Sequence, residues 1–341
     1  MKGRNTMWSA DLYLERLYEE TVAAQPVVYD ENWKKELKEK FHKALGDFSS
    51  NSEEQEAIQL EKVDMGDYIR YRIELVTIPP LKMPIYILIP KNHPLPLPTV
   101  LAIHGHGYGH KELVGLNPDG SSREKSTYHE DFAIDLVQKG FAVIAPELIG
   151  FGDRKLQEDQ GKGKPGDNSC YRLASQLLLY GKTLAGLRVH ECMKVIDYLD
   201  KQKEFDSSKI GCMGISGGGL VTAFTSILDD RIKATVISGY TNTFRGSIID
   251  RRHCLDNYIP NILQIAEMPE LIGLIAPRAL FIEAGKEDHL FPLQHVQMAL
   301  SELEKIYQSF DAESLLASHL FAGGHEISGE YSYGWLVEQL K

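Results

Sequence analysis

One serine stands in a setting that could make it a nucleophile. Ser216 lies in the stretch Gly214-Ile215-Ser216-Gly217-Gly218, a G-x-S-x-G pattern between an apolar alternation and an apolar helical segment. Glycine inside a strand or a helix costs about 0.5–1 kcal/mol relative to alanine, so such a cluster indicates a requirement other than stability. A sharp strand-to-helix turn needs small neighbours, because larger side chains would collide there. The pattern predicts an exposed serine hydroxyl, with the backbone N–H of Gly217 as a donor to an oxyanion.

A serine hydroxyl needs a base to activate it, and the base needs an acid to orient it. After a turn of this kind the chain order is serine, acid, histidine. Asp288 follows Ser216 in a loop after the apolar run "PRALFIEAG", and Glu287 beside it is the alternative acid. His325 comes later, after another apolar run and two glycines. We predict a triad of Ser216, His325 and Asp288; a solvated loop carboxylate and a surface-turn histidine are the simpler alternatives.

A second oxyanion donor is expected from an earlier loop. The stretch His104-Gly105-His106-Gly107 follows a short apolar run, "TVLAI". It resembles the H-G-G-G type of loop that supplies a backbone N–H to the oxyanion, with His106 in place of a glycine. The N–H groups of His106 and Gly107 are the candidates, and the sequence does not choose between them.

The same loop allows two other interpretations, a dinucleotide-binding turn and a metal site. The third glycine comes one position too early for a dinucleotide fingerprint, and no acidic residue stands at the ribose distance. The histidines His104, His106 and His110 lack the helical i, i+4 spacing of a metal pair and a carboxylate nearby to complete the set. We therefore expect no metal and no cofactor.

Alternating strands and helices are expected to position these loops. Strands are predicted at 68–78, 83–90, 99–105, 141–147, 209–216, 232–239, 277–285 and 313–321, and helices at 130–140, 171–202, 217–230, 292–309 and 334–341. The first two strands are expected to form an antiparallel pair. The alternation that follows predicts an α/β fold with a mostly parallel central sheet and helices on both faces.

The N-terminal part has a different pattern. Residues 1 to about 60 are expected to be helical, and apolar residues share one face within "SADLYLERLYEE" and within "ENWKKELKEKFHKALGDF". The first of these segments contains Leu12, Leu14 and Leu17, and the second contains Trp33, Leu37, Phe41 and Leu45. We predict a helical extension over 1–66 that packs on a main domain over 67–341.

An insertion at about 240–276 interrupts the alternation between two strands. Such a segment, on the side where the strands end, is often a lid or a binding loop. Arg251, Arg252 and Tyr258 lie within it and are candidate substrate-binding residues. The alternative is that the arginines face solvent on a packed pair of helices.

Composition narrows the class of protein. The 341 residues are 43% hydrophobic and 25% charged, as in an ordinary globular chain, and carry a formal net charge of −11. An acidic surface argues against nucleic acid and anionic membranes as partners. The chain shows no signal-peptide pattern and no apolar stretch of the ~18 residues a membrane span needs. Four scattered cysteines without metal spacing are expected to be reduced thiols in a cytoplasmic protein.

Taken together, the G-x-S-x-G turn at Ser216, the loops of Asp288 and His325, and the order of strands and helices along the chain resemble the α/β-hydrolase superfamily. Within it, "VIDYLDKQKEFDSSKIGCMGISGGG" and "PRALFIEAGKEDHLFP" resemble the acetyl xylan esterase and dienelactone hydrolase-like branch. The segment "WKKELKEKF" is similar to the N-terminal extension of a group of bacterial esterase-like members. Many relatives carry Met or Gln where this chain has Gly217, so substrate contacts at that position do not carry over.

The expected activity is hydrolysis of carboxylic esters of the carboxylesterase or acetylesterase type, through an acyl-enzyme on Ser216. A small-molecule ester is the expected partner, and a homo-oligomer is left open. Two alternatives remain: a peptidase or amidase on the same fold, and a binding protein that has lost catalysis. The chain has too few residues outside the α/β region for a propeller cap of about 40 residues per blade, which disfavours a prolyl-peptidase architecture.

Overall fold

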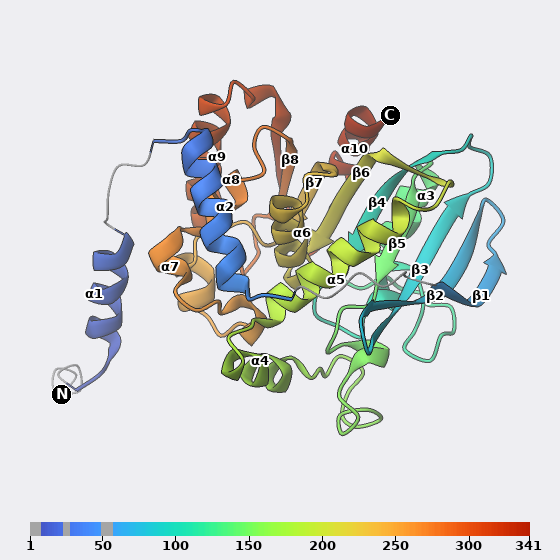
Figure 1. Cartoon of the computed structure of the whole chain (residues 1–341), viewed down its shortest axis with the longest axis horizontal. Helices are drawn as coiled ribbons and strands as arrows, with labels where there is room; N and C mark the ends of the chain where they lie inside the picture. Colours follow the sequence, from blue (N-terminus) through green and yellow to red (C-terminus); the bar gives the residue numbers. More distant parts are fainter. Residues whose placement is uncertain (1–7, 23–27, 49–56) are drawn as a thin grey trace.

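The computed structural model describes residues 8–22, 28–48 and 57–341, and its centre is a nine-stranded sheet (Figure 1). The strands are β1 (Ala57–Asp64), β2 (Tyr68–Ile78), β3 (Leu81–Pro90), β4 (Leu97–Ile103), β5 (Ala142–Pro146), β6 (Phe205–Ile215), β7 (Ile232–Ser238), β8 (Ala279–Gly285) and β9 (Leu316–Phe321). Their order is β1-β2-β3-β5-β4-β6-β7-β8-β9. The strands from β1 to β5 in this order pair antiparallel, and all later pairs are parallel, which confirms the predicted α/β architecture.

Helices cover both faces of this sheet. The helices are α1 (Asp11–Val22), α2 (Glu31–Leu45), α3 (Phe132–Gln138), α4 (Cys170–Leu179), α5 (Leu184–Leu199), α6 (Gly217–Leu228), α7 (Ile262–Ile265), α8 (Met268–Gly273), α9 (Leu293–Ser309) and α10 (Ser332–Leu340). Buried side chains of α2, α5, α6, α8 and α9 share one hydrophobic core with the sheet. Side chains of α3 and α10 belong to a second core.

The register of the parallel strands brings the candidate loops to one edge. Ile103 at the end of β4 pairs with Gly214 of β6, and Ile215 pairs with Ser238 at the end of β7. Ser238 pairs in turn with β8, whose last residue pairs with the last residue of β9. Because these carboxyl ends align, the segments that follow β4, β6, β8 and β9 meet at the same edge of the sheet.

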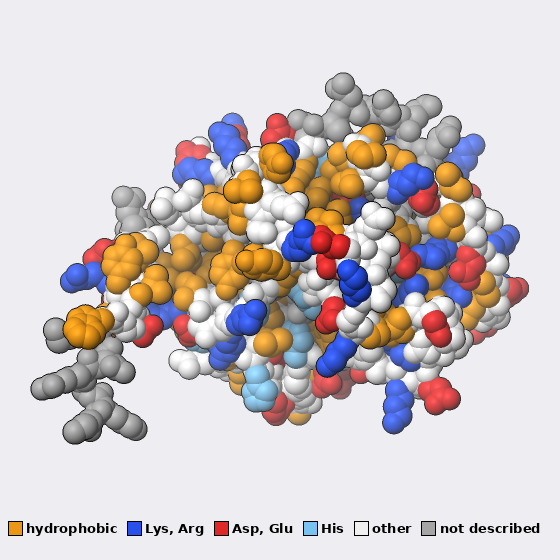
Figure 2. Space-filling model, turned by 90° about the horizontal axis from the view of Figure 1, so that it is seen from below, with side chains coloured by type: hydrophobic (Ala, Val, Ile, Leu, Met, Phe, Trp, Pro, Cys, Tyr) orange, Lys and Arg blue, Asp and Glu red, His pale blue; other side chains and the backbone are white. Residues whose placement is uncertain are grey.

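The two N-terminal helices attach differently to this body. In α2, Leu37, Phe41 and Leu45 are buried as predicted, and the Phe41 ring packs edge-on against Phe224 of α6 with ring centroids 4.8 Å apart. The α1 helix has no buried residue. Figure 2 shows hydrophobic side chains gathered on the side of the molecule where α1 lies. In α1 itself, Leu12, Leu14 and Leu17 are exposed.

Two predicted elements differ from the structure. Residues 57–64, expected to belong to the helical part, form the edge strand β1, which pairs antiparallel with β2. The single helix expected at 171–202 is two helices, α4 and α5. Gly181 between them has φ +67°, a left-handed conformation that glycine adopts readily. Thr183 then starts α5, because its side chain accepts a hydrogen bond from the Gly186 N–H.

Candidate active site

Ser216 occupies a strained turn between β6 and α6. Its backbone has φ +58° and ψ −125°, outside the regions that residues with a side chain prefer, and its N–H donates to the Ser238 carbonyl at 3.0 Å. A Cβ on Gly218 would lie within 2.2 Å of the Ile103 carbonyl oxygen. The following helix therefore needs glycine there to pack closely on β4, as the sequence pattern indicated. Ser216 is 9% exposed and lines a cavity of about 270 Å³.

Asp288 and His325 come together at the same edge. Asp288 Oδ2 lies 2.7 Å from Nδ1 of His325. The other carboxylate oxygen of Asp288 accepts the backbone N–H groups of Leu290 and Phe291, at 2.8 and 3.1 Å. Glu287, the alternative acid, instead accepts the backbone N–H of Gly323 at 2.6 Å. Of the two neighbouring acids, the structure thus pairs Asp288 with the histidine.

Two aromatic rings fix the plane of His325. Tyr128 stacks on it with ring centroids 5.4 Å apart, and Phe291 stacks with centroids 5.7 Å apart. His325 lines the cavity that Ser216 lines, and its Nε2 is buried with no hydrogen-bond partner among the described residues. Ser216 Oγ and His325 Nε2 make no hydrogen bond to each other in this structure. Such contacts are often long without substrate and tighten when it binds.

The loop after β4 is held in place by the rings of His129 and Tyr128. His129 Nε2 accepts the N–H of Gly105 at 2.9 Å, and its Nδ1 faces Thr127 Oγ1 at 3.0 Å. Because His129 is fully buried, its pKa is lowered, which keeps the ring neutral and able to accept. The hydroxyl of Tyr128 donates to the His106 carbonyl at 2.6 Å. The ring of His106 faces the nucleophile turn, since its Nδ1 lies 3.0 Å from where a Cβ on Gly217 would be.

This arrangement leaves backbone donors near Ser216. The N–H groups of His106 and Gly107 donate to no residue in the described part of the chain. The N–H of Gly217 begins α6 and has no acceptor within its own helix. A Cβ on Gly107 would lie 1.9 Å from Glu112 Oε2, so a larger residue there would require the Glu112 carboxylate to move. All three N–H groups that the sequence analysis put forward therefore remain available.

The Glu112 carboxylate also holds the loop after β4 in place. It accepts the Tyr108 N–H at 2.7 Å and lies 3.6 Å from His129 Nδ1. Burial alone would raise its pKa, but the hydrogen bonds from His129 and from the Tyr108 N–H outweigh burial and lower the pKa. Glu112 is therefore ionised and fixes the loop on the side opposite His106.

The three insertion residues lie in different surroundings. Arg251 donates from Nε to the His289 carbonyl at 2.7 Å and from Nη1 to the Gly246 carbonyl at 2.5 Å, so its side chain ties the insertion to the acid loop. Tyr258 donates to the Ile248 carbonyl at 3.1 Å and lines a separate groove between the insertion and α1. Arg252 is exposed and lines the cavity of Ser216.

The sequence analysis missed other residues at the cavity. Tyr128, Phe291 and Leu290 line it beside His325, and His253, Cys254 and Asn257 line it from the insertion. Phe291 follows the acid loop closely enough that its position could have been anticipated. Tyr128 belongs to the long connection between β4 and α3 and carries no motif of its own.

A buried polar cluster adjoins this cavity. Arg188 of α5 is fully buried, and its Nη1 lies 2.5 Å from Asp256 Oδ2. Its Nη2 donates to the sulfur of Cys170 at 3.0 Å. Burial alone would raise the pKa of Asp256, but the charges of His106 and Arg188 outweigh burial and lower it, so the carboxylate is ionised. The sulfur of Cys254 belongs to the same group.

The three histidines of this stretch fall into two clusters. His104 and His110 both lie beside Glu147, with Nε2 of each ring 3.4 Å from a carboxylate oxygen, whereas His106 faces Asp256. His104 makes two hydrogen bonds: Nε2 accepts the Leu148 N–H at 3.0 Å, and Nδ1 lies 2.8 Å from the Gly105 carbonyl.

Within the described residues, no helix has the length and apolarity required to cross a bilayer.

Comparisons with known proteins agree with this fold. The chain is 29% identical over 252 residues to "Putative hydrolase YtaP" of Bacillus subtilis (strain 168), an alignment that covers 72% of this chain and 78% of that protein. The structure superposes with a TM-score of 0.75 on a "putative acetyl xylan esterase" from Bacteroides fragilis NCTC 9343, at 19% identity and covering 92% of this chain and 82% of that one. A glucuronoyl esterase from Solibacter usitatus gives a TM-score of 0.64 at 13% identity, covering 93% and 94%.

The family model described as the Abhydrolase family matches residues 17–314. The match includes Ser216 and Asp288, and His325 lies just beyond it. Since the match extends over most of the chain and the sheet is mostly parallel as predicted, the resemblance found in the sequence is confirmed: this chain belongs to the Abhydrolase family.

Proposed function

We propose that this protein hydrolyses carboxylic esters with Ser216 as the nucleophile. The observation that carries the proposal is a single cavity lined by Ser216, on its strained turn, and by His325, whose other nitrogen is bonded to Asp288. The strain holds the serine at the edge of the sheet, where helix α6 begins. Esterases among the structural neighbours support the same reaction class, although likeness at such identities concerns the fold.

Each residue has one role in the proposed reaction. Ser216 Oγ attacks the ester carbonyl while His325 Nε2 takes its proton, and Asp288 stabilises the imidazolium that forms. The N–H of Gly217, with that of His106 or Gly107, holds the oxyanion. His325 then gives its proton to the leaving alcohol, and water activated by the same nitrogen releases the acid from the acyl-enzyme. Proton transfers therefore begin and end on His325, which is unchanged after one cycle.

The size of the cavity favours a short acyl group. Its volume of about 270 Å³ is slightly below that of typical ligand sites, which range over about 300–1,000 Å³. The rings of Tyr128 and Phe291 occupy space on either side of His325. We therefore propose acetyl and similarly short esters as substrates, and a p-nitrophenyl series should show kcat/KM falling as the acyl chain lengthens.

Arg252 is the insertion residue that we propose to contact the substrate, because it lines the cavity and Arg251 and Tyr258 do not. Arg252→Gln should raise KM for an ester whose alcohol carries a carboxylate, and leave KM for a neutral ester of the same acid unchanged. An equal effect on both esters would remove the proposed contact.

Covalent labelling tests the whole proposal. A fluorophosphonate probe should modify the native protein at Ser216, identified by peptide mass, and should not modify Ser216→Ala. The matched control is Ser238→Ala, because Ser238 ends the neighbouring strand but donates its hydroxyl to Glu283 at 2.8 Å and does not line the cavity. The proposal fails if Ser216→Ala keeps its esterase activity. Cleavage of aminoacyl anilides in preference to p-nitrophenyl acetate would support the peptidase alternative.

A further inference from the structure

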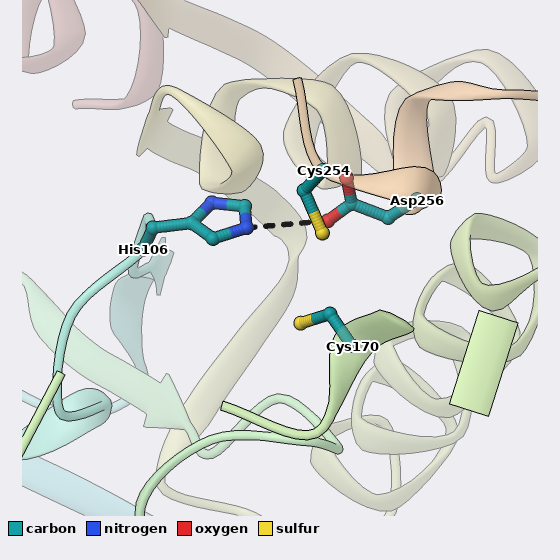
Figure 3. Close-up of side chains that lie close together, drawn as sticks. All are labelled: His106, Cys170, Cys254 and Asp256. Atoms are coloured by element: carbon teal, nitrogen blue, oxygen red, sulfur yellow. Dashed lines mark ion pairs between the residues drawn. The ribbon is translucent and has the colours of Figure 1, made fainter. Parts of the chain in front are cut away.

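Four side chains with metal-binding atoms meet beside the proposed active site (Figure 3). His106 comes from the loop after β4, Cys170 is the first residue of α4, and Cys254 and Asp256 belong to the insertion. One potential ligand atom from each lies within 4.8 Å of all the others. Figure 3 shows the imidazole, the carboxylate and the two sulfurs turned toward one another from separate segments.

The chemistry of this set fits a soft divalent cation. Two sulfurs, one imidazole nitrogen and one carboxylate oxygen are the ligand types that Zn²⁺ takes in tetrahedral sites, with Zn–S near 2.3 Å and Zn–N about 2.0–2.1 Å. In such a tetrahedron the ligand atoms lie roughly 3.3–3.8 Å apart. The atoms here are therefore close to that spacing, and a shift of roughly 0.5 Å by each outer ligand would reach it.

One ligand atom lacks the partner that its burial calls for. Nε2 of His106 is buried and has no hydrogen-bond partner among the described residues. Its nearest charged neighbour is Asp256 Oδ2 at 3.9 Å, beyond hydrogen-bond distance. A cation between them would satisfy both atoms.

The surroundings supply the second layer of contacts that metal ligands have. Arg188 donates to the Cys170 sulfur at 3.0 Å and pairs with Asp256. Asn257 donates to the other oxygen of Asp256 at 2.7 Å. The charges also balance, because one divalent cation and Arg188 together neutralise one carboxylate and two thiolates.

We propose that His106, Cys170, Cys254 and Asp256 bind one zinc-like divalent cation, which fastens the insertion to the wall of the Ser216 cavity. Among these ligands, His106 and Cys254 line that cavity, so the cation would fix the shape of the site. The role is structural, and the inference does not depend on which reaction Ser216 performs. It replaces the expectation from sequence that the chain holds no metal and that these two cysteines are unrelated.

Cobalt(II) titration of the full-length, reduced and chelator-treated protein tests the site. Bound Co²⁺ should give a thiolate-to-metal charge-transfer band and intense visible bands of a tetrahedral complex, saturating at one equivalent, and Zn²⁺ should displace it. Cys170→Ala and Cys254→Ala should each lose the charge-transfer intensity. Cys192→Ala is the matched control, because Cys192 is equally buried in α5 but outside the cluster, and it should bind as the native chain does.

Three outcomes would overturn the proposal. The first is a native, reduced protein with no charge-transfer band, a result that needs no variant to fold. The second is a band that keeps its native intensity in both Cys170→Ala and Cys254→Ala. The third is a Cys170–Cys254 disulfide found by mass analysis under non-reducing conditions, together with no cobalt binding after reduction.

Discussion

Replacing Asp288 with asparagine should disable the proposed base while keeping its place. In the native chain one oxygen of Asp288 accepts two backbone N–H groups, from Leu290 and Phe291, and the other faces His325 Nδ1 at 2.7 Å. An asparagine has a single oxygen, which the two N–H donors would claim. Its NH₂ group would then face Nδ1 and donate to it. The imidazole would carry its proton on Nε2, and Nε2 could no longer accept the proton of Ser216.

The expected loss of activity in Asp288→Asn follows from this change of the His325 tautomer. A wrong tautomer removes the base completely, and the corresponding exchange in a Ser-His-Asp enzyme costs about 10⁴ in kcat. We expect a similar fall of kcat for a short p-nitrophenyl ester, roughly 5.5 kcal/mol of transition-state stabilisation at 1.36 kcal/mol per decade. KM should change little, because the cavity walls stay in place.

Two measurements separate this effect from misfolding. The thermal midpoint of Asp288→Asn should stay close to that of the native protein, because both backbone hydrogen bonds are retained. Nitrogen NMR of the His325 ring should report protonation at Nε2 instead of Nδ1. Glu287→Gln is the matched control and should keep most of the activity, since Glu287 bonds to Gly323 and not to the histidine. An Asp288→Asn protein within tenfold of native kcat would refute the reasoning.

Three further predictions concern stability. Gly218→Ala would place a Cβ about 2.2 Å from a carbonyl oxygen of β4, so urea unfolding should show a loss of about 1–3 kcal/mol or more, together with lower esterase activity. Phe41→Ala should cost about 3–5 kcal/mol in the same assay, because the ring is fully buried against Phe224, whereas the exposed Leu12→Ala should change stability little. Burial lowers the pKa of His110 to about 4. Burial would raise the pKa of Glu147, but the charge of His110 and the hydrogen bonds from its other neighbours outweigh burial and lower that pKa to about 2. Both groups therefore bind protons more readily in the unfolded chain than in the folded one. The stability that His110 contributes is complete above about pH 6.5 and is lost as the pH falls to about 4. The stability that Glu147 contributes is lost as the pH falls below about 4.5. Urea midpoints should fall by the equivalent of about 2–3 kcal/mol between pH 7 and 4; His110→Gln should flatten this slope above pH 4.5, and an unchanged slope would contradict the assignment.

The candidate triad was predictable because each member follows a strand that the local pattern reveals. The apolar runs before Ser216 and Asp288 are short, continuous and flanked by glycine, as buried parallel strands are, whereas the run before His325 is a half-buried strand that its apolar residues and the two glycines after it still indicate. Parallel strands with aligned ends bring their following loops to one edge, so the order of elements was enough to group the residues. The sequence analysis preferred Asp288 and kept Glu287 as the alternative, and the structure pairs Asp288 with His325 and Glu287 with the Gly323 N–H.

Elements without an inward-facing apolar stripe were missed. Strand β1 is an edge strand whose side chains are mostly exposed or half-buried, so its sequence lacks the alternation that marks a strand packed on a core. The boundary between α4 and α5 was hidden for a different reason. A single glycine is tolerated in a helical pattern, and what ends α4 is the left-handed backbone of Gly181, which composition does not reveal.

The cysteine cluster shows the limit of spacing arguments most directly. Cys170 and Cys254 are 84 positions apart, and only the packing of the insertion against α4 and α5 brings their sulfurs near His106. Metal motifs are readable from sequence when the ligands lie on one element or one turn. Here three separate segments supply the ligands, so no local pattern exists to be found.

The histidines around the site take different roles because their two nitrogens face different groups. His104 and His129 each have both nitrogens engaged, and in each ring Nε2 accepts a backbone N–H. Rings held this way position the backbone, and they have no free nitrogen with which to move a proton. His325 has Nδ1 bonded to Asp288, while its Nε2 has no hydrogen-bond partner in the described chain and its ring lines the cavity of Ser216. Of these three rings, His325 alone can accept a proton from a substrate or from Ser216, and it can do so only while Asp288 remains an acceptor.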